Sequence, residues 1–476
     1  MTEIITGVKN TRPFYYFEQI SKIPRGSGNE GRIAGYLQGF AFERGLECIK
    51  DKDNNVLITK SATQGRENEE PVLLQAHTDM VCEKNKDSIH DFSTEQIKLI
   101  QEGNILRADG TTLGADDGFG VACMLAILDS DSISHPRLEC LFTSSEEIGL
   151  VGASLFDYSN ITSRRLINLD SAEEDTVIIG CCGGVRTELI CPMEYEYGDF
   201  DAYRISVGGL YGGHSGEDID KNRLNANILM GRIIKFLTKK AEIRISEING
   251  GDKDNAIPRE CEALITSDTP LDNIIEDMLT FAKEHIRADE DSALAVRIEK
   301  TFTDRAFSVS DTRNIIKALS VANGVLHYRT SAPILPKVSR NLARIRTSEK
   351  GVSIGFSSRS YLEKELENCT AELDEMASAI GGSTYHHERY PGWESPRSSR
   401  LVRAWAEAYR KINGGEPNIT LIHAGLECGI ITSSVPDMTA ISVGCNVHDL
   451  HTPFETMEID SMDRMYDIII AFLKGA

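Results

Sequence analysis

Residues 72–79 read Val-Leu-Leu-Gln-Ala-His-Thr-Asp, and they give the clearest indication of the fold class. A short apolar run ends in polar residues, as in a buried strand that stops at the edge of a sheet. The pattern recurs at residues 138–142, 166–169 and 439–443, and residues 118–130 between the first two runs have helical spacing. Buried strands that alternate with helices predict an α/β domain with a mostly parallel sheet flanked by helices.

The middle of the chain has a different pattern. Apolar residues alternate with polar ones at 203–207, 294–298 and 352–356, and residues 225–239 carry apolar side chains at helical spacing. Period-2 alternation is typical of strands with one exposed face, so this stretch predicts an α+β domain. We therefore expect one α/β domain from residues 1–185 and 390–476, interrupted by a second domain at residues 186–389.

Composition excludes several classes of function. The 476 residues contain 51 Lys and Arg against 73 Asp and Glu, a net charge of −22, which argues against nucleic acid or an anionic membrane as partner. No run of 18 apolar residues predicts a transmembrane helix, and the first 20 residues do not resemble a signal peptide. Eleven scattered cysteines are typical of a reducing compartment, so we expect a cytoplasmic protein.

Acidic and histidine residues gather where the apolar runs end. His77 and Asp79 share one face of an extended chain, although a lone His-x-Asp is more often structural. Asp116 and Asp117 open a helix, where one Asp is explained as an N-cap and two are harder to explain.

Further acidic residues follow the later runs. Glu146 and Glu147 are either solvated surface residues or a metal ligand beside a general base. Asp170 follows residues 166–169, and His448 and His451 follow residues 439–443, either as ligands or as ordinary loop residues.

Taken together, these residues indicate a metal site. A set of His, Asp and Glu without Cys suits Zn²⁺ or Mn²⁺, and the number of acids suggests two ions that share a bridging carboxylate. Two such ions activate water and stabilise a tetrahedral intermediate, which is the chemistry of hydrolysis.

The chain resembles the di-zinc metallopeptidase family of aminoacylases, carboxypeptidase G-type enzymes and dipeptidases, and within it the cytosolic aminoacyl-histidine (Xaa-His) dipeptidases. Seven motifs carry the resemblance in the right order over nearly the whole chain. They are AHTDMVCEKN (76–85), GTTLGADDG (110–118), FTSSEEIGLVGA (142–153), NLDSAEE (168–174), GGHSGEDI (212–219), NAIPRE (255–260) and HAGLECG (423–429).

The resemblance implies two ions, Zn²⁺ or alternatively Mn²⁺ or Co²⁺, and a role for each residue. It implies His77 and Asp170 as ligands of one ion, and Asp116 as the bridge. Glu147 and His451 are implied as ligands of the other ion; His451 is preferred to His448 because it directly precedes Thr452-Pro453-Phe454-Glu455. It also implies that Asp79 orients His77, and that Glu146 is the general base for a metal-bridging water.

For the middle domain, the resemblance implies a lid that also dimerises. His214 would stabilise the oxyanion from the partner subunit of a homodimer. Asn255 and Arg359 would hold the substrate carboxylate, and Glu427 would bind its free amine.

The implied activity is hydrolysis of short peptides with a free N-terminus, including Xaa-His dipeptides such as β-alanyl-histidine. A broader di- or tripeptidase and an N-acyl amino acid deacylase are alternatives on the same scaffold, and a non-catalytic binding module is a third. Asp117 stands where many relatives have Asn, and His448 is a second histidine near the ligand position.

Overall fold

The structure is a computed structural model that describes residues 4–330 and 334–475. Contacts between Cα atoms divide the chain into two compact units. Unit 1 contains residues 1–181, 393–421 and 426–476, and unit 2 contains residues 182–392 and 422–425. Residues 182–185, 390–392 and 422–425, which the sequence assigned to the first domain, therefore belong to the second unit.

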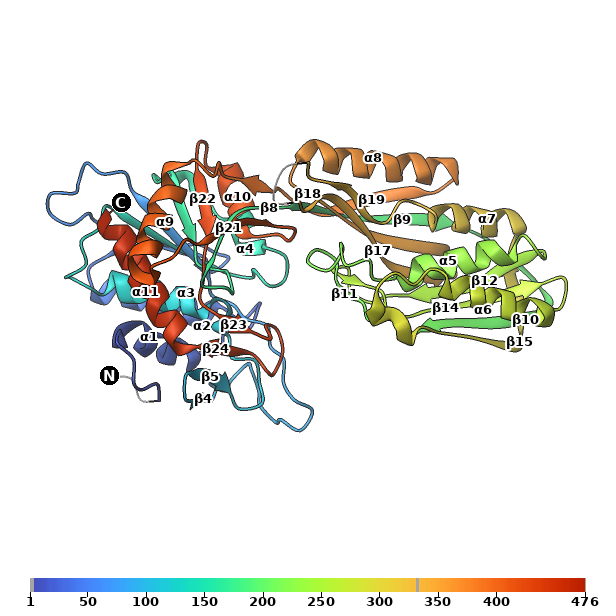
Figure 1. The fold of residues 1–476 in the computed structure, drawn as a ribbon, viewed down its shortest axis with the longest axis horizontal. Helices are drawn as coiled ribbons and strands as arrows, with labels where there is room; N and C mark the ends of the chain where they lie inside the picture. Colours follow the sequence, from blue (N-terminus) through green and yellow to red (C-terminus); the bar gives the residue numbers. More distant parts are fainter. Residues whose placement is uncertain (1–3, 331–333, 476) are drawn as a thin grey trace. The chain divides into compact units, whose positions relative to one another are not determined.

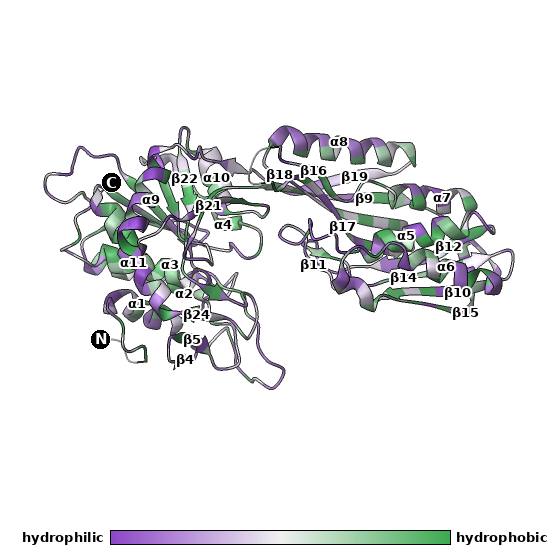
Figure 2. Ribbon diagram, in the orientation of Figure 1, coloured by the Kyte–Doolittle hydropathy of each residue, from purple (hydrophilic) through white to green (hydrophobic). Residues whose placement is uncertain are grey.

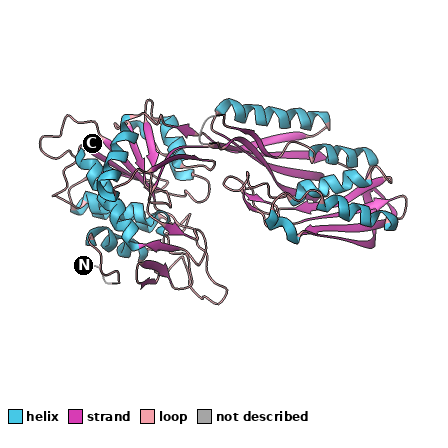
Figure 3. Cartoon of the chain, viewed as in Figure 1, coloured by secondary structure: helices cyan, strands magenta, loops and turns pink. Residues whose placement is uncertain are grey.

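Unit 1 is built on a mixed sheet with helices around it (Figures 1 and 3). The strand order is β1-β2-β6-β3-β7-β22-β8-β20, and β21 pairs with β8. Its strands are β1 Glu47–Lys50, β2 Val56–Lys60, β3 Val72–His77, β6 Leu138–Thr143, β7 Arg165–Asn168, β8 Thr176–Cys181, β20 Trp393–Glu394, β21 Asn418–Ile422 and β22 Thr439–Ser442. The four central strands, β6, β3, β7 and β22, are parallel, whereas β1, β2, β8 and β20 pair antiparallel. The predicted α/β class is confirmed, with the parallel part confined to the centre of the sheet.

Helices pack around this sheet. They are α1 Thr11–Ser21, α2 Gly31–Glu43, α3 Ala115–Leu128, α4 Val151–Leu155, α9 Arg400–Asn413, α10 Glu427–Ser434 and α11 Ile459–Gly475. The helical spacing predicted for residues 118–130 is found in α3, and nearly all of its residues are buried because β3 and α1 both pack against it. A helix that is apolar on all sides needs such cover.

A smaller sheet in unit 1 has the order β23-β24-β5-β4. Its strands are β4 Leu99–Glu102, β5 Ile105–Ala108, β23 Val447–His448 and β24 Thr456–Glu458. Because β23 and β24 flank residues 449–455, this sheet fixes both ends of the loop that carries His451.

Unit 2 contains an antiparallel sheet with the order β15-β10-β14-β12-β17-β18-β9-β19, with β16 paired to β17 (Figure 1). Its strands are β9 Gly183–Pro192, β10 Tyr195–Gly208, β12 Ile243–Gly250, β14 Cys261–Ser267, β15 Ala295–Phe307, β16 Gly324–Tyr328, β17 Pro336–Ser348, β18 Gly351–Ser360 and β19 Ser383–Tyr390. A separate pair joins β11 Gly213–His214 to β13 Ala256–Ile257.

Helices cover one face of this larger sheet (Figure 2). Buried apolar residues of these helices and of the strands form one core. These helices are α5 Ala226–Leu237, α6 Ile275–Lys283, α7 Val309–Ala318 and α8 Glu363–Ala379. Alternating apolar residues of β10 and β18 belong to this core. The predicted exposed face is found on β10, where Arg204 is exposed, but not on β18, which is buried on both faces because β17 and β9 flank it and helix α8 packs nearby.

Candidate metal centre

Parallel strands bring the predicted ligands together in unit 1. His77 is the last residue of β3 and is paired with Thr143, the last residue of β6. Asp170 lies two residues after β7. Because parallel strands end at the same edge of a sheet, the loops that follow them meet there, which is where open α/β sheets place their sites.

Asp116 lies at the centre of this cluster. Its Oδ1 is 2.9 Å from Nε2 of His77, and its Oδ2 is 3.2 Å from Nε2 of His451. One carboxylate thus faces two imidazoles that come from distant parts of the chain. Although burial opposes it, hydrogen bonding to His451 and His77 lowers the pKa of Asp116.

Two groups of donors share Asp116, and each could hold a metal ion: His77, Asp116 and Asp170, and Asp116, Glu147 and His451. Nε2 of His77 is 3.6 Å from Oδ1 of Asp170, and Nε2 of His451 is 3.1 Å from Oε2 of Glu147. These are the two ligand sets that the family resemblance implies.

The residues fit divalent cations. Oε1 of Glu147 is buried and has no hydrogen-bond partner among the described residues, so a carboxylate oxygen is left for an ion. Nδ1 of His77 lies 3.1 Å from the carbonyl oxygen of Asp79, which leaves Nε2 as the ligand atom. Oxygen and imidazole donors without thiolates suit Zn²⁺, Mn²⁺ or Co²⁺.

The contacts with carboxylates change the pKa values of His77 and His451. Burial lowers the pKa of His77, but hydrogen bonds with Asp116 and Asp170 outweigh it and raise the pKa well above its ordinary value. Hydrogen bonds with Asp116 and Glu147 raise the pKa of His451 to about 11. Bound cations would take the place of the histidine protons as the positive partners of these carboxylates.

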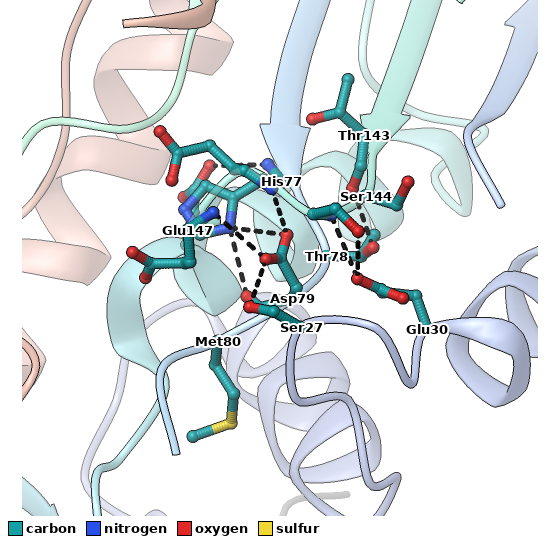
Figure 4. Close-up of polar contacts among 12 residues, drawn as sticks. Ser27, Glu30, His77, Thr78, Asp79, Met80, Thr143, Ser144 and Glu147 are labelled. Atoms are coloured by element: carbon teal, nitrogen blue, oxygen red, sulfur yellow. Dashed lines mark hydrogen bonds and ion pairs between the residues drawn. The ribbon is translucent and has the colours of Figure 1, made fainter. Parts of the chain in front are cut away.

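Asp79 fixes the loop that carries Glu146 and Glu147. Its Oδ1 accepts a hydrogen bond from the Glu146 backbone N–H at 3.0 Å, and its Oδ2 accepts one from the Glu147 N–H at 3.2 Å (Figure 4). Oδ1 of Asp79 is also 3.6 Å from Nδ1 of His77. Asp79 therefore joins the loop after β3 to the loop after β6.

Glu146 lies beside the ligands. It forms with His77 and Glu147 a third group of donor atoms within 4.8 Å of one another. Burial raises the pKa of Glu146 well above its ordinary value, and the negative charges of Asp170 and Glu147 raise it further. A carboxyl group with a raised pKa suits proton transfer near neutral pH.

Asp117 and Asp116 have different roles. Oδ1 of Asp117 accepts a hydrogen bond from the Gly120 N–H at 3.2 Å, and Oδ2 accepts one from the His77 N–H at 3.2 Å. Asp117 thus caps the regular part of α3, and the extra acid that departs from the family pattern is explained by this contact.

His448 and His451 also separate. Nε2 of His448 lies 3.1 Å from Oε1 of Glu458, on the small sheet, whereas His451 lies at Asp116 and Glu147. The structure thus brings His451 to the predicted ligands and leaves His448 outside the three donor groups found among the described residues.

Glu427 is buried beneath the site with a relative exposure of 0 %. Its Oε2 accepts hydrogen bonds from Nε2 of Gln75 at 2.5 Å and Oγ1 of Thr143 at 2.8 Å. Burial raises the pKa of Glu427 to about 8, so this carboxyl group is largely neutral at pH 7. Its predicted role as the anion that binds a free amine stays a prediction.

The raised pKa of Glu427 predicts a pH effect on stability. Between pH 4.5 and pH 8 the unfolded chain releases this proton while the folded protein retains it, so the free energy of unfolding falls as pH rises. The Glu427 carboxyl group contributes a slope approaching about 1.4 kcal/mol of unfolding free energy per pH unit. In the metal-free protein, Glu427→Gln should remove this contribution. Urea unfolding of the wild type and of Glu427→Gln at pH 5, 6, 7 and 8 measures both free energies. A difference between them that stays constant over this pH range would exclude a raised pKa of Glu427.

The remaining predicted residues belong to unit 2. His214 ends β11, and its Nδ1 lies 3.2 Å from the donating N–H of Glu217. The carbonyl of Asn255 accepts a hydrogen bond from the Ser215 N–H at 2.8 Å, which ties these two motifs together.

Arg359 is buried near the end of β18. Its Nη1 donates to Oη of Tyr390 at 2.8 Å, and its Nε has no hydrogen-bond partner among the described residues. Burial, together with the charges of Arg359 and His214, lowers the pKa of His423 to about 3. These basic side chains therefore lie near one another in unit 2.

Sequence reasoning missed Glu455 as a structural partner of the site. Its carboxylate accepts hydrogen bonds from four consecutive backbone N–H groups, those of Leu113, Gly114, Ala115 and Asp116, at 2.8–3.4 Å. It thereby joins the loop after His451 to the loop that carries Asp116. The sequence feature that could have indicated this role is the position of Glu455 at the end of the Thr-Pro-Phe-Glu run, directly after His451.

A profile of peptidase family M20/M25/M40 matches residues 73–475. The chain belongs to this peptidase family. It is therefore a hydrolase of peptide bonds, and the predicted class of enzyme is confirmed.

Individual family members match over almost their full lengths. Cytosol non-specific dipeptidase of Escherichia coli (strain K12) is 33% identical over 465 residues, which are 96% of each chain. The crystal structure of aminoacylhistidine dipeptidase from Vibrio alginolyticus has a TM-score of 0.87 at 32% identity and covers 99% of this chain and 98% of that one. The crystal structure of aminopeptidase PepT from Bacillus cereus ATCC 10987, at 16% identity and a TM-score of 0.57, shares the fold.

Proposed function

We propose that this M20-family member is a metal-dependent dipeptidase that cleaves short peptides with a free N-terminus, among them Xaa-His dipeptides such as β-alanyl-histidine. The observation that carries the proposal is the Asp116 carboxylate, which faces His77 with one oxygen and His451 with the other. The names of the dipeptidases from Escherichia coli and Vibrio alginolyticus support the substrate class.

In this proposal, His77, Asp116, Asp170, Glu147 and His451 hold two divalent cations, for which Zn²⁺, Mn²⁺ and Co²⁺ are all suitable. When bound, such ions acidify water and polarise the scissile carbonyl. Glu146 is the general base: its carboxylate takes a proton from the attacking water and passes it to the leaving amine. Asp79 holds the Glu146 backbone and so sets the direction of that carboxylate.

His214 is proposed to stabilise the oxyanion. Because Nδ1 accepts a hydrogen bond from the Glu217 N–H, the proton of the neutral ring is on Nε2. An Nε2–H donor is what a developing oxyanion requires.

Arg359 and Asn255 are proposed to hold the substrate carboxylate. The free Nε of Arg359 and its buried position suit a two-point hydrogen bond to a carboxylate. We expect Arg359→Lys to raise KM for a dipeptide about 10- to 100-fold with a smaller change in kcat, because lysine cannot donate the paired bonds. Steady-state kinetics measure this, and an unchanged KM would exclude the assignment.

A homodimer formed through unit 2, with His214 serving the partner subunit, is also proposed. Exposed apolar side chains near the sheet edge of unit 2 support it: Phe302 on β15 is 79 % exposed and Tyr197 on β10 is 72 % exposed. Light scattering tests this part, since a mass equal to one chain would contradict it. The cytosolic relative supports a cytoplasmic location.

The substrate is tested with a panel of β-alanyl-histidine, other Xaa-His pairs, Ala-Ala, a tripeptide and an N-acetyl amino acid. Preferred cleavage of Xaa-His pairs supports the specific proposal. Equal cleavage of all dipeptides favours a broader peptidase, as the name of the Escherichia coli relative suggests. Cleavage of the N-acetyl compound alone would favour a deacylase.

A further inference from the structure

A loop near the N-terminus reaches the metal centre without supplying a ligand. Residues 25–30, called here the 25–30 loop, connect the segment after α1 to the start of α2 and read Arg-Gly-Ser-Gly-Asn-Glu. Gly26 forms a parallel bridge with Met80, so this loop runs directly beside the segment that follows His77. Three of its side chains contact loops that carry the proposed ligands and base.

Arg25 joins two of these loops through their carbonyl groups. Its Nη1 donates to the carbonyl oxygens of Thr78 at 3.0 Å and Asp79 at 3.1 Å, and its Nη2 donates to that of Gly114 at 2.5 Å. The guanidinium group is buried among acidic side chains, with an exposure of 3%. It therefore links the backbone next to His77 to the backbone next to Asp116.

Two glycines make room for this guanidinium group. A Cβ atom at Gly114 would lie 2.6 Å from Nη2 of Arg25, and one at Gly118 would lie 2.7 Å from the same atom. Gly114 also has a φ of +70°, which an L side chain rarely adopts. The glycines of the GTTLGADDG motif thus accommodate Arg25.

Ser27 holds Asp79 from the same side. Its hydroxyl donates to Oδ2 of Asp79 at 2.7 Å (Figure 4). The same carboxylate accepts the backbone N–H groups of Glu146 and Glu147. A hydrogen bond from Ser27 therefore fixes the acceptor that positions both glutamates.

Glu30 forms hydrogen bonds with Ser145, the residue directly before Glu146. Its Oε1 accepts hydrogen bonds from the Ser145 N–H at 3.1 Å, the Ser145 hydroxyl at 2.8 Å and the Gly28 N–H at 2.8 Å. Ser145 has a φ of +53°, an unfavourable backbone conformation for a residue with a side chain. The two hydrogen bonds that Ser145 donates to Glu30 hold it in that conformation.

We propose that the 25–30 loop is a positioning element of the metal centre, in which Arg25 sets the spacing of the His77 and Asp116 loops and Ser27 and Glu30 set the direction of Glu146 and Glu147. This inference rests on the proposed function for the roles of those glutamates. A ligand displaced by a fraction of an ångström binds its ion less well, and a displaced base transfers protons more slowly.

The test compares Glu30→Ala with Glu30→Gln. All three hydrogen bonds end at Oε1, which glutamine retains and alanine lacks. We expect Glu30→Ala to weaken Co²⁺ binding at one site about 10- to 100-fold, to change the visible absorption of the Co²⁺ protein and to lower kcat about 10- to 100-fold at a nearly constant KM. Glu30→Gln should restore each of these values to within about threefold of the wild type.

Ser27 supplies a second pair of variants should Glu30→Ala not fold. Ser27→Ala should lower kcat at constant KM, and Ser27→Thr, which keeps the hydroxyl, should restore it. Ser21→Ala is the matched control, because the Ser21 hydroxyl bonds the Phe17 carbonyl within α1.

The outcomes separate this inference from the proposed function. Wild-type Co²⁺ affinity, absorption and kcat in folded Glu30→Ala and Ser27→Ala would overturn the positioning role. A wild-type protein that binds Co²⁺ but cleaves no peptide would instead overturn the proposed function, and the Co²⁺ measurements would still decide the positioning role.

Discussion

Glu146→Ala is expected to lower kcat about 10²- to 10⁴-fold, which is the usual contribution of a general base. The side chain lies within the donor group of His77 and Glu147, yet the two ligand sets that share Asp116 do not include it. Its backbone is held by Asp79, so removing the carboxyl group leaves the loop in place. The loss should therefore affect catalysis while metal binding and folding persist.

The measurement combines kcat, the number of bound metal ions and thermal unfolding for Glu146→Ala and the isosteric Glu146→Gln. Both variants should bind as much metal as the wild type. Glu47→Ala, at an exposed position of β1, controls for general effects of removing a carboxylate. Wild-type turnover in Glu146→Gln would show that another group accepts the proton.

Asp116→Ala is expected to reduce turnover to the background rate by removing the carboxylate shared by both ligand sets. Because one oxygen faces His77 and the other faces His451, a single substitution affects both sites. We expect each ion to bind more than about 100-fold more weakly. The surrounding loop should remain folded, since Glu455 holds the backbone N–H groups of this segment.

Asp117→Asn is the matched control, because the adjacent carboxylate caps α3 and bonds the His77 backbone. It should cost about 1 kcal/mol of stability, because an amide keeps only one of the two acceptor oxygens, and should leave metal stoichiometry unchanged. Metal titration by calorimetry and urea unfolding distinguish the two variants. Equal metal loss in Asp117→Asn and Asp116→Ala would contradict the division of roles between these neighbours.

The sequence predicted the central strands and the residues that follow them because both are encoded locally. Apolar runs predicted β3, β6, β7 and β22, and all four were found in the parallel centre of the sheet. Ligand-type residues directly after strands are recognisable, and those after β3 and β7 lie in the same cluster. The antiparallel outer strands were not predicted, because strand order depends on contacts between distant segments.

Other parts of the site carry no comparable sequence signal. Arg25 and Glu455 contact backbone carbonyl and N–H groups, which every residue possesses, so no partner can be recognised from residue types. The family resemblance implied that Glu427 is an anion that binds the substrate amine. Its burial against Gln75 and Thr143 became evident only in the fold.

No helix among the described residues is long and apolar enough to cross a membrane. The acidic composition had already argued against an anionic membrane surface as a partner. The alternative of a non-catalytic binding module is weakened by the site itself, since the structure brings together all five proposed ligands and places Glu146 beside them.

We propose that two divalent ions, held at the ends of the parallel strands, make this chain a dipeptidase. The most direct measurement titrates metal-free protein with Zn²⁺ or Co²⁺ and records bound metal and β-alanyl-histidine hydrolysis together. Hydrolysis should appear only with metal and reach its plateau at two bound ions per chain. Two bound ions without cleavage of any short peptide, or cleavage that persists without metal, would contradict the account.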